Sequence, residues 1–468
     1  MFRTLREKLG LSWRIPIEVQ APRRGQVEGR VLYSYTRGLV SYTLYLDVLG
    51  RVRLRVEEPP RPPPERLRDL VSGLASPASE EEAYWLERHR SGYGPLYPLI
   101  SDGHVEEIAY SGPGTPVLVV HRRFPGVWVA VDMELSEEEA DALAVQLARK
   151  AGKLVSIAQP VAEGLTQEGY RVAATFRQEV SRRGSSFVLR KYAERPLSVG
   201  DILASGTITP VHLALLWLVV EAQMFTLVVG PMGSGKTTLL QALIDLTPPH
   251  TRVVTVEDTP ELRPVKPYWD PLHTRPSPAG ESVPDIDLEA ILRFALRRRA
   301  EYIVVGEVRG REAKLLAQAA ALGHGSMATF HADSPQTAIA RLQLEPIALP
   351  PLFLKLLSCI VVVKRLPASE GGMKRRVTEI ATVIEGEEVE TVAEYNPKTD
   401  RLQPEDPVEL AETPLAKQAW RRLGEPGDLA LELVERADVL KTLTGAPPEE
   451  VYRTLSLFYA RRMFKTTP

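Results

Sequence analysis

The chain has 468 residues, of which 44% are hydrophobic and 25% are charged, and its formal net charge is −2. This length predicts two to four domains, each with its own core. The lack of a basic excess argues against a dedicated nucleic-acid-binding protein, and the single cysteine, Cys359, excludes a disulfide framework and a cysteine-rich zinc site.

Four regions follow one another along the chain: residues 1–79, 80–195, 196–385 and 386–468. In the first region, residues 29–35, 41–48 and 51–56 alternate or run apolar and predict strands, before a proline-rich break at residues 59–64. We interpret this region as a partner-facing domain.

The second region, residues 80–195, predicts an α+β domain. A helix start is predicted at Ser136 and Glu139, which form a capping box. Strands are predicted at residues 117–120, 127–131, 171–175 and 187–190.

The third region alternates apolar strands with amphipathic helices. This pattern predicts an α/β fold class in which helices cover both faces of a parallel sheet. Its most apolar stretch, residues 211–220, is too short to cross a bilayer, and no signal-peptide core follows residues 1–4. We therefore expect a soluble, cytoplasmic protein. The fourth region reads as a mostly charged helical C-terminal extension.

The strongest motif is a phosphate-binding loop of the form G-x-x-x-x-G-K-[ST], between an apolar strand at residues 225–229 and a predicted helix. Its glycines let backbone amides surround phosphate oxygens, and the helix start adds a positive dipole end. Lys236 is expected to neutralise the β and γ phosphates, and the Thr237 hydroxyl is expected to bind Mg²⁺. The predicted nucleotide-binding residues are Gly230, Pro231, Met232, Gly233, Ser234, Gly235, Lys236, Thr237 and Thr238.

Two further apolar strands end in acidic residues. Residues 303–305 lead to Glu307, which we expect beside the Mg²⁺ ion, partly through water, where it would polarise a water molecule. Residues 253–256 lead to Glu257, Asp258 and Glu261, at a strand end of the kind that binds ligands in open α/β sheets. These carboxylates predict a cation or water-positioning site; a solvated acidic turn is the alternative.

Two histidines, His324 and His331, lie seven residues apart near the end of this region. Their spacing leaves three interpretations open: a zinc site, a hydrogen-bonding sensor of phosphate or of a neighbouring subunit, and two ordinary loop or core histidines.

These motifs, in this order, resemble those of the type II/IV secretion and type IV pilus motor ATPases. Upstream segments at residues 92–96 and 181–191 also resemble this family and are similar to its archaeal branch, which drives archaella, archaeal pili and related secretion. The motifs that carry the resemblance are a Walker A at residues 230–237, an Asp box at 257–262, a Walker B at 306–310 and a His box at 323–332.

The resemblance implies a RecA-like P-loop ATPase core preceded by an α+β N-terminal domain, with ATP and Mg²⁺ as cofactors. It implies Glu261 as the water-activating base, Glu307 as the Walker B acid, and His324 and His331 as a His box that acts with Lys236 in catalysis. Arginines of the N-terminal domain would reach the γ-phosphate. The candidates by position are Arg171, Arg183 and Arg190.

The function expected from the resemblance is a homohexameric, ATP-hydrolysing motor at the inner face of the cell membrane. It would power assembly of a pilus-like filament, or secretion, through a polytopic membrane platform protein, with no stable nucleic-acid partner. One alternative is a nucleic-acid translocase with the same core, which the Asp and His boxes disfavour. The other is a regulatory module that binds nucleotide without hydrolysis, which Glu261 and Glu307 disfavour.

Overall fold

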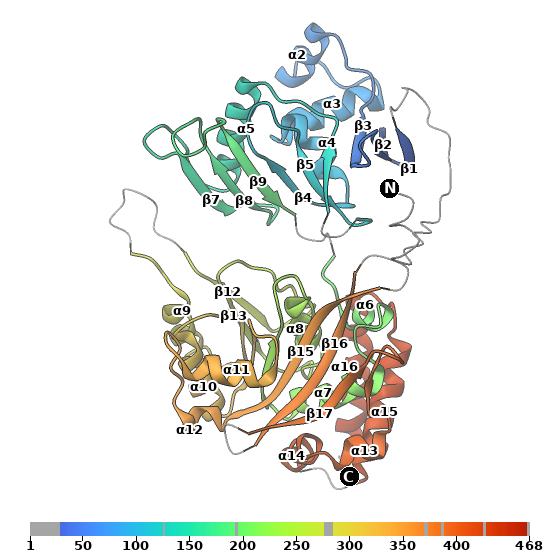
Figure 1. Cartoon of the computed structure of the whole chain (residues 1–468), viewed down its shortest axis with the longest axis vertical. Helices are drawn as coiled ribbons and strands as arrows, with labels where there is room; N and C mark the ends of the chain where they lie inside the picture. Colours follow the sequence, from blue (N-terminus) through green and yellow to red (C-terminus); the bar gives the residue numbers. More distant parts are fainter. Residues whose placement is uncertain are drawn as a thin grey trace, which may run out of the picture. The chain divides into compact units, whose positions relative to one another are not determined.

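The structure is a computed structural model that describes residues 29–124, 127–191, 195–275, 284–368, 373–384, 388–424 and 427–465. Residues 1–28 of the predicted partner-facing region therefore lie outside the described residues. The chain forms two compact units (Figure 1). The N-terminal unit comprises Met1–Glu194 with Ser369–Gly372, and the C-terminal unit comprises Arg195–Ala368 with Met373–Pro468.

The described residues of the N-terminal unit form one nine-stranded sheet in the order β1-β2-β3-β6-β5-β4-β9-β8-β7. The strands are β1 (Arg30–Arg37), β2 (Val40–Leu46), β3 (Val52–Glu57), β4 (Val105–Tyr110), β5 (Leu118–His121), β6 (Trp128–Val131), β7 (Val161–Leu165), β8 (Arg171–Thr175) and β9 (Ser186–Arg190). The helices are α2 (Pro64–Ser72), α3 (Glu80–Arg90), α4 (Tyr97–Ser101) and α5 (Glu137–Lys150), with a short 3₁₀ turn η1 (Gly94–Leu96).

Strand β3 links the strands before residue 79 to those after it. Arg53 and Leu54 of β3 pair in parallel with Ala130 and Val131 of β6. This pairing satisfies backbone groups that would otherwise line an open sheet edge. The described strands on both sides of residue 79 consequently belong to one sheet and one unit.

Helix α5 begins at the capping box that the sequence predicts. The Ser136 hydroxyl accepts the Glu139 N–H at 3.2 Å, and the Glu139 carboxylate accepts the Ser136 N–H at 3.0 Å. Leu143 and Leu147 lie one turn apart on the same face of α5 and are buried against the sheet. Local sequence thus sets both where this helix starts and which face it buries.

A buried polar cluster ties β1 to the rest of the N-terminal unit. Tyr35 of β1 donates a hydrogen bond to Asp102 Oδ2 at 2.5 Å, and its hydroxyl lies 3.0 Å from His121 Nε2. His121 Nδ1 accepts the Arg123 N–H at 3.1 Å, so a neutral His121 carries its proton on Nε2 and donates it to Tyr35. The ligand atoms of Asp102, His104 and His121 lie within 4.8 Å of one another. Because both ring nitrogens of His121 have partners within the protein, we interpret these three side chains as a hydrogen-bond network.

This cluster makes the N-terminal unit sensitive to acid. Burial lowers the pKa of His121 to about 4, against the opposing attraction of Asp102. Between pH 6.5 and pH 4 the unfolded chain takes up a proton that folded His121 resists, so stability falls as pH falls. We expect a loss on the order of 2 kcal/mol at pH 5 relative to pH 7. Hydrogen–deuterium exchange of peptides from β1 and β5 measures this loss of stability, once the exchange rates are corrected for the pH dependence of intrinsic amide exchange.

The control for this prediction is His121→Asn, which should show a smaller pH dependence of protection in the same peptides. His89→Asn changes an exposed histidine of α3 and should behave as wild type. Equal pH dependence in all three proteins would contradict the prediction.

The C-terminal unit contains a second sheet, whose described strands run in the order β12-β11-β13-β14-β10-β15-β16-β17-β18. The strands from β12 to β15 are parallel, and those from β15 to β18 are antiparallel. They are β10 (Phe225–Val229), β11 (Val253–Glu257), β12 (Trp269–His273), β13 (Tyr302–Val308), β14 (Gly325–Phe330), β15 (Leu357–Pro367), β16 (Met373–Ile384), β17 (Glu388–Asn396) and β18 (Arg401–Gln403).

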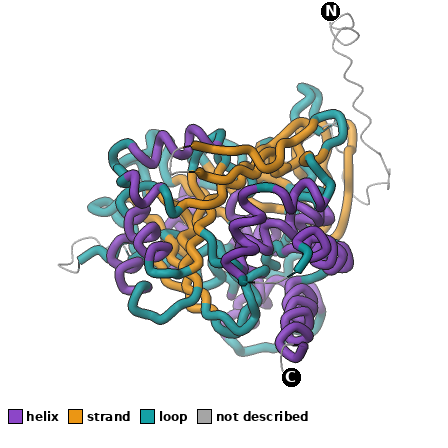
Figure 2. Tube along the Cα trace, turned by 90° about the horizontal axis from the view of Figure 1, so that it is seen from below, coloured by secondary structure: helices purple, strands orange, loops and turns teal. Residues whose placement is uncertain are grey.

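Helices cover both faces of this sheet (Figures 1 and 2). One apolar core lies between the sheet and the first group of helices, and a second core lies on the other face. The first group is α6 (Val199–Ala204), α7 (Pro210–Glu221), α8 (Lys236–Asp245), α13 (Pro407–Glu412), α14 (Pro414–Leu423), α15 (Leu429–Thr442) and α16 (Pro448–Lys465). The second group is α9 (Leu288–Ala295), α10 (Glu312–Ala321), α11 (Pro335–Gln343) and α12 (Pro351–Leu354). The predicted α/β fold class is confirmed.

Helix α7 explains the apolar stretch at residues 211–220. Its residues from His212 to Val220 are all buried, because the sheet lies on one side and α14 and α15 pack on the other. A helix that is apolar all round is expected where every face is covered. Among the described helices, none combines the length and apolar character that crossing a membrane requires.

The region after residue 385 begins with strands. β17 and β18 extend the sheet beyond β16, and only then do α13 to α16 follow. A buried ion-pair network holds these helices to α7: Arg436, 1% exposed, lies 2.6 Å from Glu221 and 2.6 Å from Glu432. The C-terminal segment is therefore part of the same compact unit as the parallel sheet.

Candidate functional site

The phosphate-binding loop joins β10 to α8 at the carboxyl edge of the parallel strands. Gly233 and Gly235 have φ values of 70° and 102°, a left-handed conformation that favours glycine. A Cβ at Gly230 would lie 2.2 Å from the Val363 carbonyl oxygen. The three glycines of the motif are thus required by the backbone path of the loop itself.

Two side chains of this loop fit a phosphate ligand. Lys236 is buried, and its Nζ donates to the Pro231 carbonyl at 3.0 Å and lies 3.4 Å from His331 Nδ1. Burial lowers the pKa of Lys236, while the charges of Glu307 and Glu261 oppose that change. Ser234 Oγ is fully buried and has no hydrogen-bond partner among the described residues. Together with the N-terminus of α8, these groups offer donors to an anion.

His331 bridges Lys236 and Glu307. Its Nε2 contacts Glu307 Oε1, and its Nδ1 faces the Lys236 ammonium. Since an ammonium can only donate, Nδ1 accepts, and the proton of a neutral His331 lies on Nε2, the ring nitrogen next to the Glu307 carboxylate. Burial and the charge of Lys236 lower the pKa of His331, which favours this neutral form.

Arg309 holds the second oxygen of Glu307 through an ion pair. Glu312 accepts the backbone N–H groups of Arg309 and Gly310 at 2.5 and 2.7 Å and so fixes the turn after β13. Arg309 was not among the residues predicted for this site, although a basic residue two positions after an acid at a strand end was a usable signal.

Glu257 and Glu261 differ in environment. Glu257 is 3% exposed, and its Oε1 accepts the N–H groups of Glu261 and Leu262 at 3.0 and 3.1 Å. Burial raises the pKa of Glu257 to about 7. A Cβ on Gly306 would lie 2.9 Å from Glu257 Cγ, so the glycine before Glu307 leaves room for this anchor. Glu257 therefore positions the backbone that carries the half-buried Glu261.

His324 does not lie with the other predicted residues. It precedes β14, and its Nδ1 donates to the Ala300 carbonyl at 2.7 Å. His331 follows β14, whose six residues span about 20 Å when extended. The two histidines consequently lie at opposite ends of β14: His331 lies beside Lys236, whereas His324 does not, and the role of His324 in the His box stays a prediction.

The three candidate arginines belong to the N-terminal unit. Arg171 of β8 and Arg190 of β9 are directly opposite each other in the sheet, and Arg171 also pairs with Glu163. Arg183 lies in the turn between these strands, and all three are exposed. Their role at a γ-phosphate stays a prediction.

Comparison with known proteins places these features in a family. The family described as "Type II/IV secretion system protein" matches residues 174–366. "Uncharacterized protein MJ0900" of Methanocaldococcus jannaschii is 32% identical over 385 residues, which cover 81% of this chain and 69% of that protein. The chain belongs to the type II/IV secretion system protein family.

Other proteins similar to this member of the type II/IV secretion family carry more specific names. "Putative conjugal transfer protein Rv3659c" of Mycobacterium tuberculosis is 31% identical over 321 residues, 64% of this chain and 87% of that protein. The solved VirB11 ATPase from the Brucella suis type IV secretion system is 25% identical, with a TM-score of 0.31. That match covers 62% of this chain and 93% of the solved one.

Proposed function

We propose that this protein hydrolyses ATP with Mg²⁺ and converts the energy into mechanical work for a secretion or pilus system. The observation that carries the proposal is the contiguous set of Lys236, His331 and Glu307 beside the phosphate-binding loop. Lys236 and the loop amides would bind the phosphates, and the Thr237 hydroxyl with Glu307 would hold Mg²⁺, partly through water.

The two acidic residues, Glu261 and Glu307, would have different roles in hydrolysis. Glu261 would accept a proton from the attacking water, because its carboxylate is the half-buried one whose backbone Glu257 fixes. Glu307 would be held in place by Arg309 and His331, which contact its two oxygens. The predicted arginines, Arg171, Arg183 and Arg190, would supply positive charge to the γ-phosphate.

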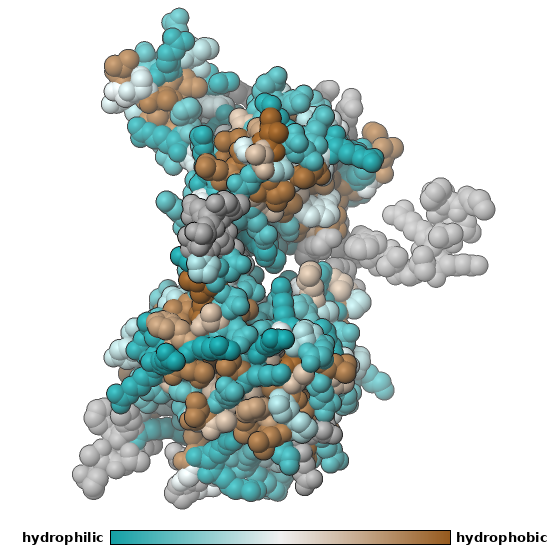
Figure 3. All heavy atoms as spheres, turned by 90° about the vertical axis from the view of Figure 1, so that its left-hand side faces the viewer, coloured by the Kyte–Doolittle hydropathy of each residue, from teal (hydrophilic) through white to brown (hydrophobic). Residues whose placement is uncertain are grey.

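We further propose that the protein works as a homohexamer on a polytopic membrane platform protein, at the cytoplasmic face of the membrane, as its family resemblance implies. Exposed apolar side chains support contact with other chains (Figure 3). Beside the phosphate-binding loop, Met232 is 84% exposed and Leu344 is 63% exposed. Both line a cavity of about 680 Å³ that also contains His331.

The first test is phosphate release by the purified full-length chain with MgATP, with the assembly mass measured in parallel. We expect turnover and a hexamer. A folded hexamer that binds ATP but releases no phosphate, with and without lipid, would reject the motor and favour a regulatory nucleotide-binding module.

The system served is tested in cells that lack the gene. Wild type should restore a surface filament visible by electron microscopy, whereas Glu307→Gln should not. Unchanged filaments in every strain would reject the pilus assignment. Export of protein or DNA would then be the remaining role for this ATPase.

A second candidate is a nucleic-acid translocase, because one relative is named a conjugal transfer protein. Stimulation of ATP hydrolysis several-fold by single-stranded DNA would favour it. Equal turnover with and without DNA would favour the filament or secretion motor.

The two histidines provide a paired test of the site. We expect His331→Ala to lower ATP turnover about tenfold or more, because the imidazole ring contacts both Glu307 and Lys236. His324→Ala should change turnover less than about twofold, since this histidine lies at the other sheet edge. Steady-state phosphate release measures both. Equal losses of ATP turnover in the two variants would contradict the assignment of His331, and not His324, to the site beside Lys236.

A further inference from the structure

Two arginines of the β15–β16 hairpin lie over the phosphate-binding loop. Arg375 Nε donates to the Gly233 carbonyl at 3.4 Å, and a Cβ on Gly235 would lie 3.0 Å from Arg375 Cδ. A Cβ on Gly233 would lie 3.7 Å from Arg365 Nη1. Both guanidinium groups therefore approach the glycines that shape the loop.

Strand length brings these arginines to the loop. Val229, the last residue of β10, pairs with Val362 of β15, and β15 continues to Pro367. The hairpin consequently extends past the edge of the sheet at the point where the loop begins. Arg365 and Arg375 are directly opposite each other in this extension.

Their charges are not balanced within the described part of the chain. Like charges directly opposite in a sheet are unfavourable, yet no described carboxylate forms an ion pair with Arg365 or Arg375. Arg365 is half-buried, which adds a desolvation cost for its charge. An anion that binds at this point would relieve both costs.

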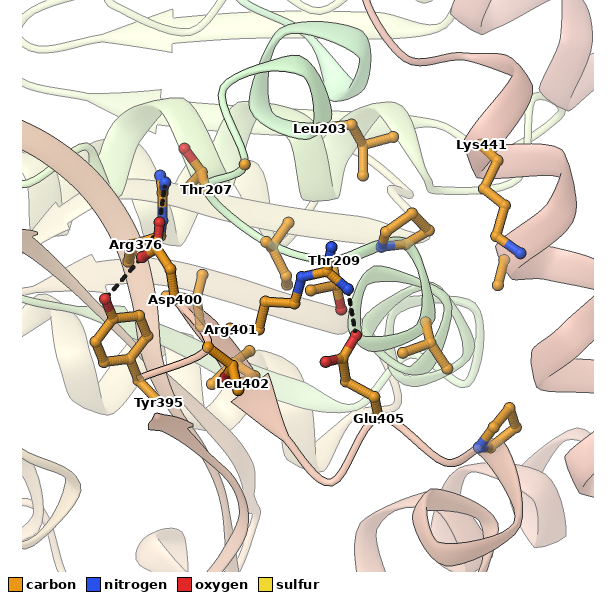
Figure 4. Close-up of a pocket in the computed structure, with 18 of the residues that line it drawn as sticks. Leu203, Thr207, Thr209, Arg376, Tyr395, Asp400, Arg401, Leu402, Glu405 and Lys441 are labelled. Carbon is orange, nitrogen blue, oxygen red and sulfur yellow. Dashed lines mark hydrogen bonds and ion pairs between the residues drawn. The ribbon is translucent and has the colours of Figure 1, made fainter. Parts of the chain in front are cut away.

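The two cations that flank Arg375 on β16 behave differently. Lys374 and Arg376 alternate with Arg375 along β16, and both pair with Asp400, at 2.8 and 2.9 Å. Figure 4 shows Arg376 and Tyr395 directed at Asp400, on the wall of a cavity of about 720 Å³. The charged groups of that cavity pair with one another, whereas Arg365 and Arg375 form no ion pair with a described carboxylate and approach the phosphate-binding loop.

We infer that Arg365 and Arg375 bind the phosphate groups that ATP and ADP share. This inference rests on the proposed function as an ATPase. Loops of this motif surround the α- and β-phosphates with backbone N–H groups, and the two arginines approach two glycines of that loop. Guanidinium groups suit this task because they offer several donors in a fixed plane. They would hold nucleotide in both states, whereas the arginines proposed from the N-terminal unit would respond to the γ-phosphate.

The experiment measures binding of fluorescent mant-ADP by anisotropy with the full-length chain and Mg²⁺. Arg365→Gln and Arg375→Gln should each raise the Kd about tenfold, as expected for the loss of a charge-assisted hydrogen bond. Lys374→Gln is the matched control, since it removes one positive charge from the opposite face of the same strand. Its Kd should stay within about twofold of wild type. Thermal melting of each variant confirms that it is folded.

The possible results separate the two proposals. Unchanged ADP affinity in both folded arginine variants would overturn this inference, even if their turnover falls. An equal loss of ADP affinity in Lys374→Gln would also overturn it, because the loss would then depend on the net charge of the hairpin and not on the position of the two arginines. A wild-type chain that binds neither ADP nor ATP would overturn the proposed function, and this inference with it.

Discussion

Glu307→Gln is expected to lower ATP turnover by about 10²- to 10⁴-fold while the affinity for ADP changes less than about threefold. Glutamine keeps the size of the side chain but removes the charge that would support Mg²⁺ and that His331 and Arg309 contact. The loop and Lys236, which would bind the phosphates, remain unchanged. Single-turnover and steady-state phosphate release, together with mant-ADP titration, measure the two effects.

The same strand offers a matched control. Glu301 lies at the other end of β13, where its carboxylate accepts the Arg252 N–H at 2.7 Å. Glu301→Gln makes the same chemical change at the opposite sheet edge and should leave turnover within about twofold. If Glu307→Gln retains more than a tenth of wild-type turnover, the assignment of Glu307 to the magnesium site is wrong.

Arg436→Ala is expected to destabilise the C-terminal unit by about 3 kcal/mol or more. Arg436 is 1% exposed and lies between Glu221 of α7 and Glu432 of α15, with its guanidinium 4.8 Å from the Trp217 ring centroid. Removing it takes the ion-pair partner from Glu221, leaves Glu432 with Arg462 alone, and deletes a cation–π contact. Chemical denaturation, monitored by the tryptophan fluorescence of this unit, measures the loss in the free energy of unfolding.

Lys441→Ala is the control on the same helix. Lys441 and its partner Asp438 are both more than 60% exposed, and exposed pairs of this kind contribute about 0–1 kcal/mol. The variant should unfold close to wild type. Equal stability of Arg436→Ala and wild type would show that the C-terminal helices do not depend on this network.

Several features of the fold follow from short stretches of sequence. The capping box at Ser136 depends on residues three apart and appears in the structure where the sequence predicts it. The phosphate-binding loop is also local: Gly233 and Gly235 adopt left-handed conformations that the motif anticipates. β4 and β7 escaped prediction because β4 contains two adjacent glutamates and β7 contains a glycine, which weaken the alternating pattern of a strand.

The candidate site was predictable where a residue lies at or just after the carboxyl end of a strand. Glu307 lies in the last two residues of β13 and Glu261 follows β11, and parallel strands bring their carboxyl ends to one edge. His331 follows β14 in the same way, but His324 precedes it. The spacing of seven residues could not distinguish one shared site from two separate edges, because that depends on whether the intervening residues form a strand or a turn.

By itself, the sequence determined the nucleotide loop, the acidic residues at the strand ends and the α/β alternation, because each depends on neighbours within about ten residues. Only the tertiary structure decided that β3 joins β6, that His324 lies away from Lys236, and that Arg365 and Arg375 approach the loop. Those outcomes depend on which strands pair and on how far β15 extends past β10. Strand order and register are set by packing between distant segments, and a local pattern of residues does not contain that information.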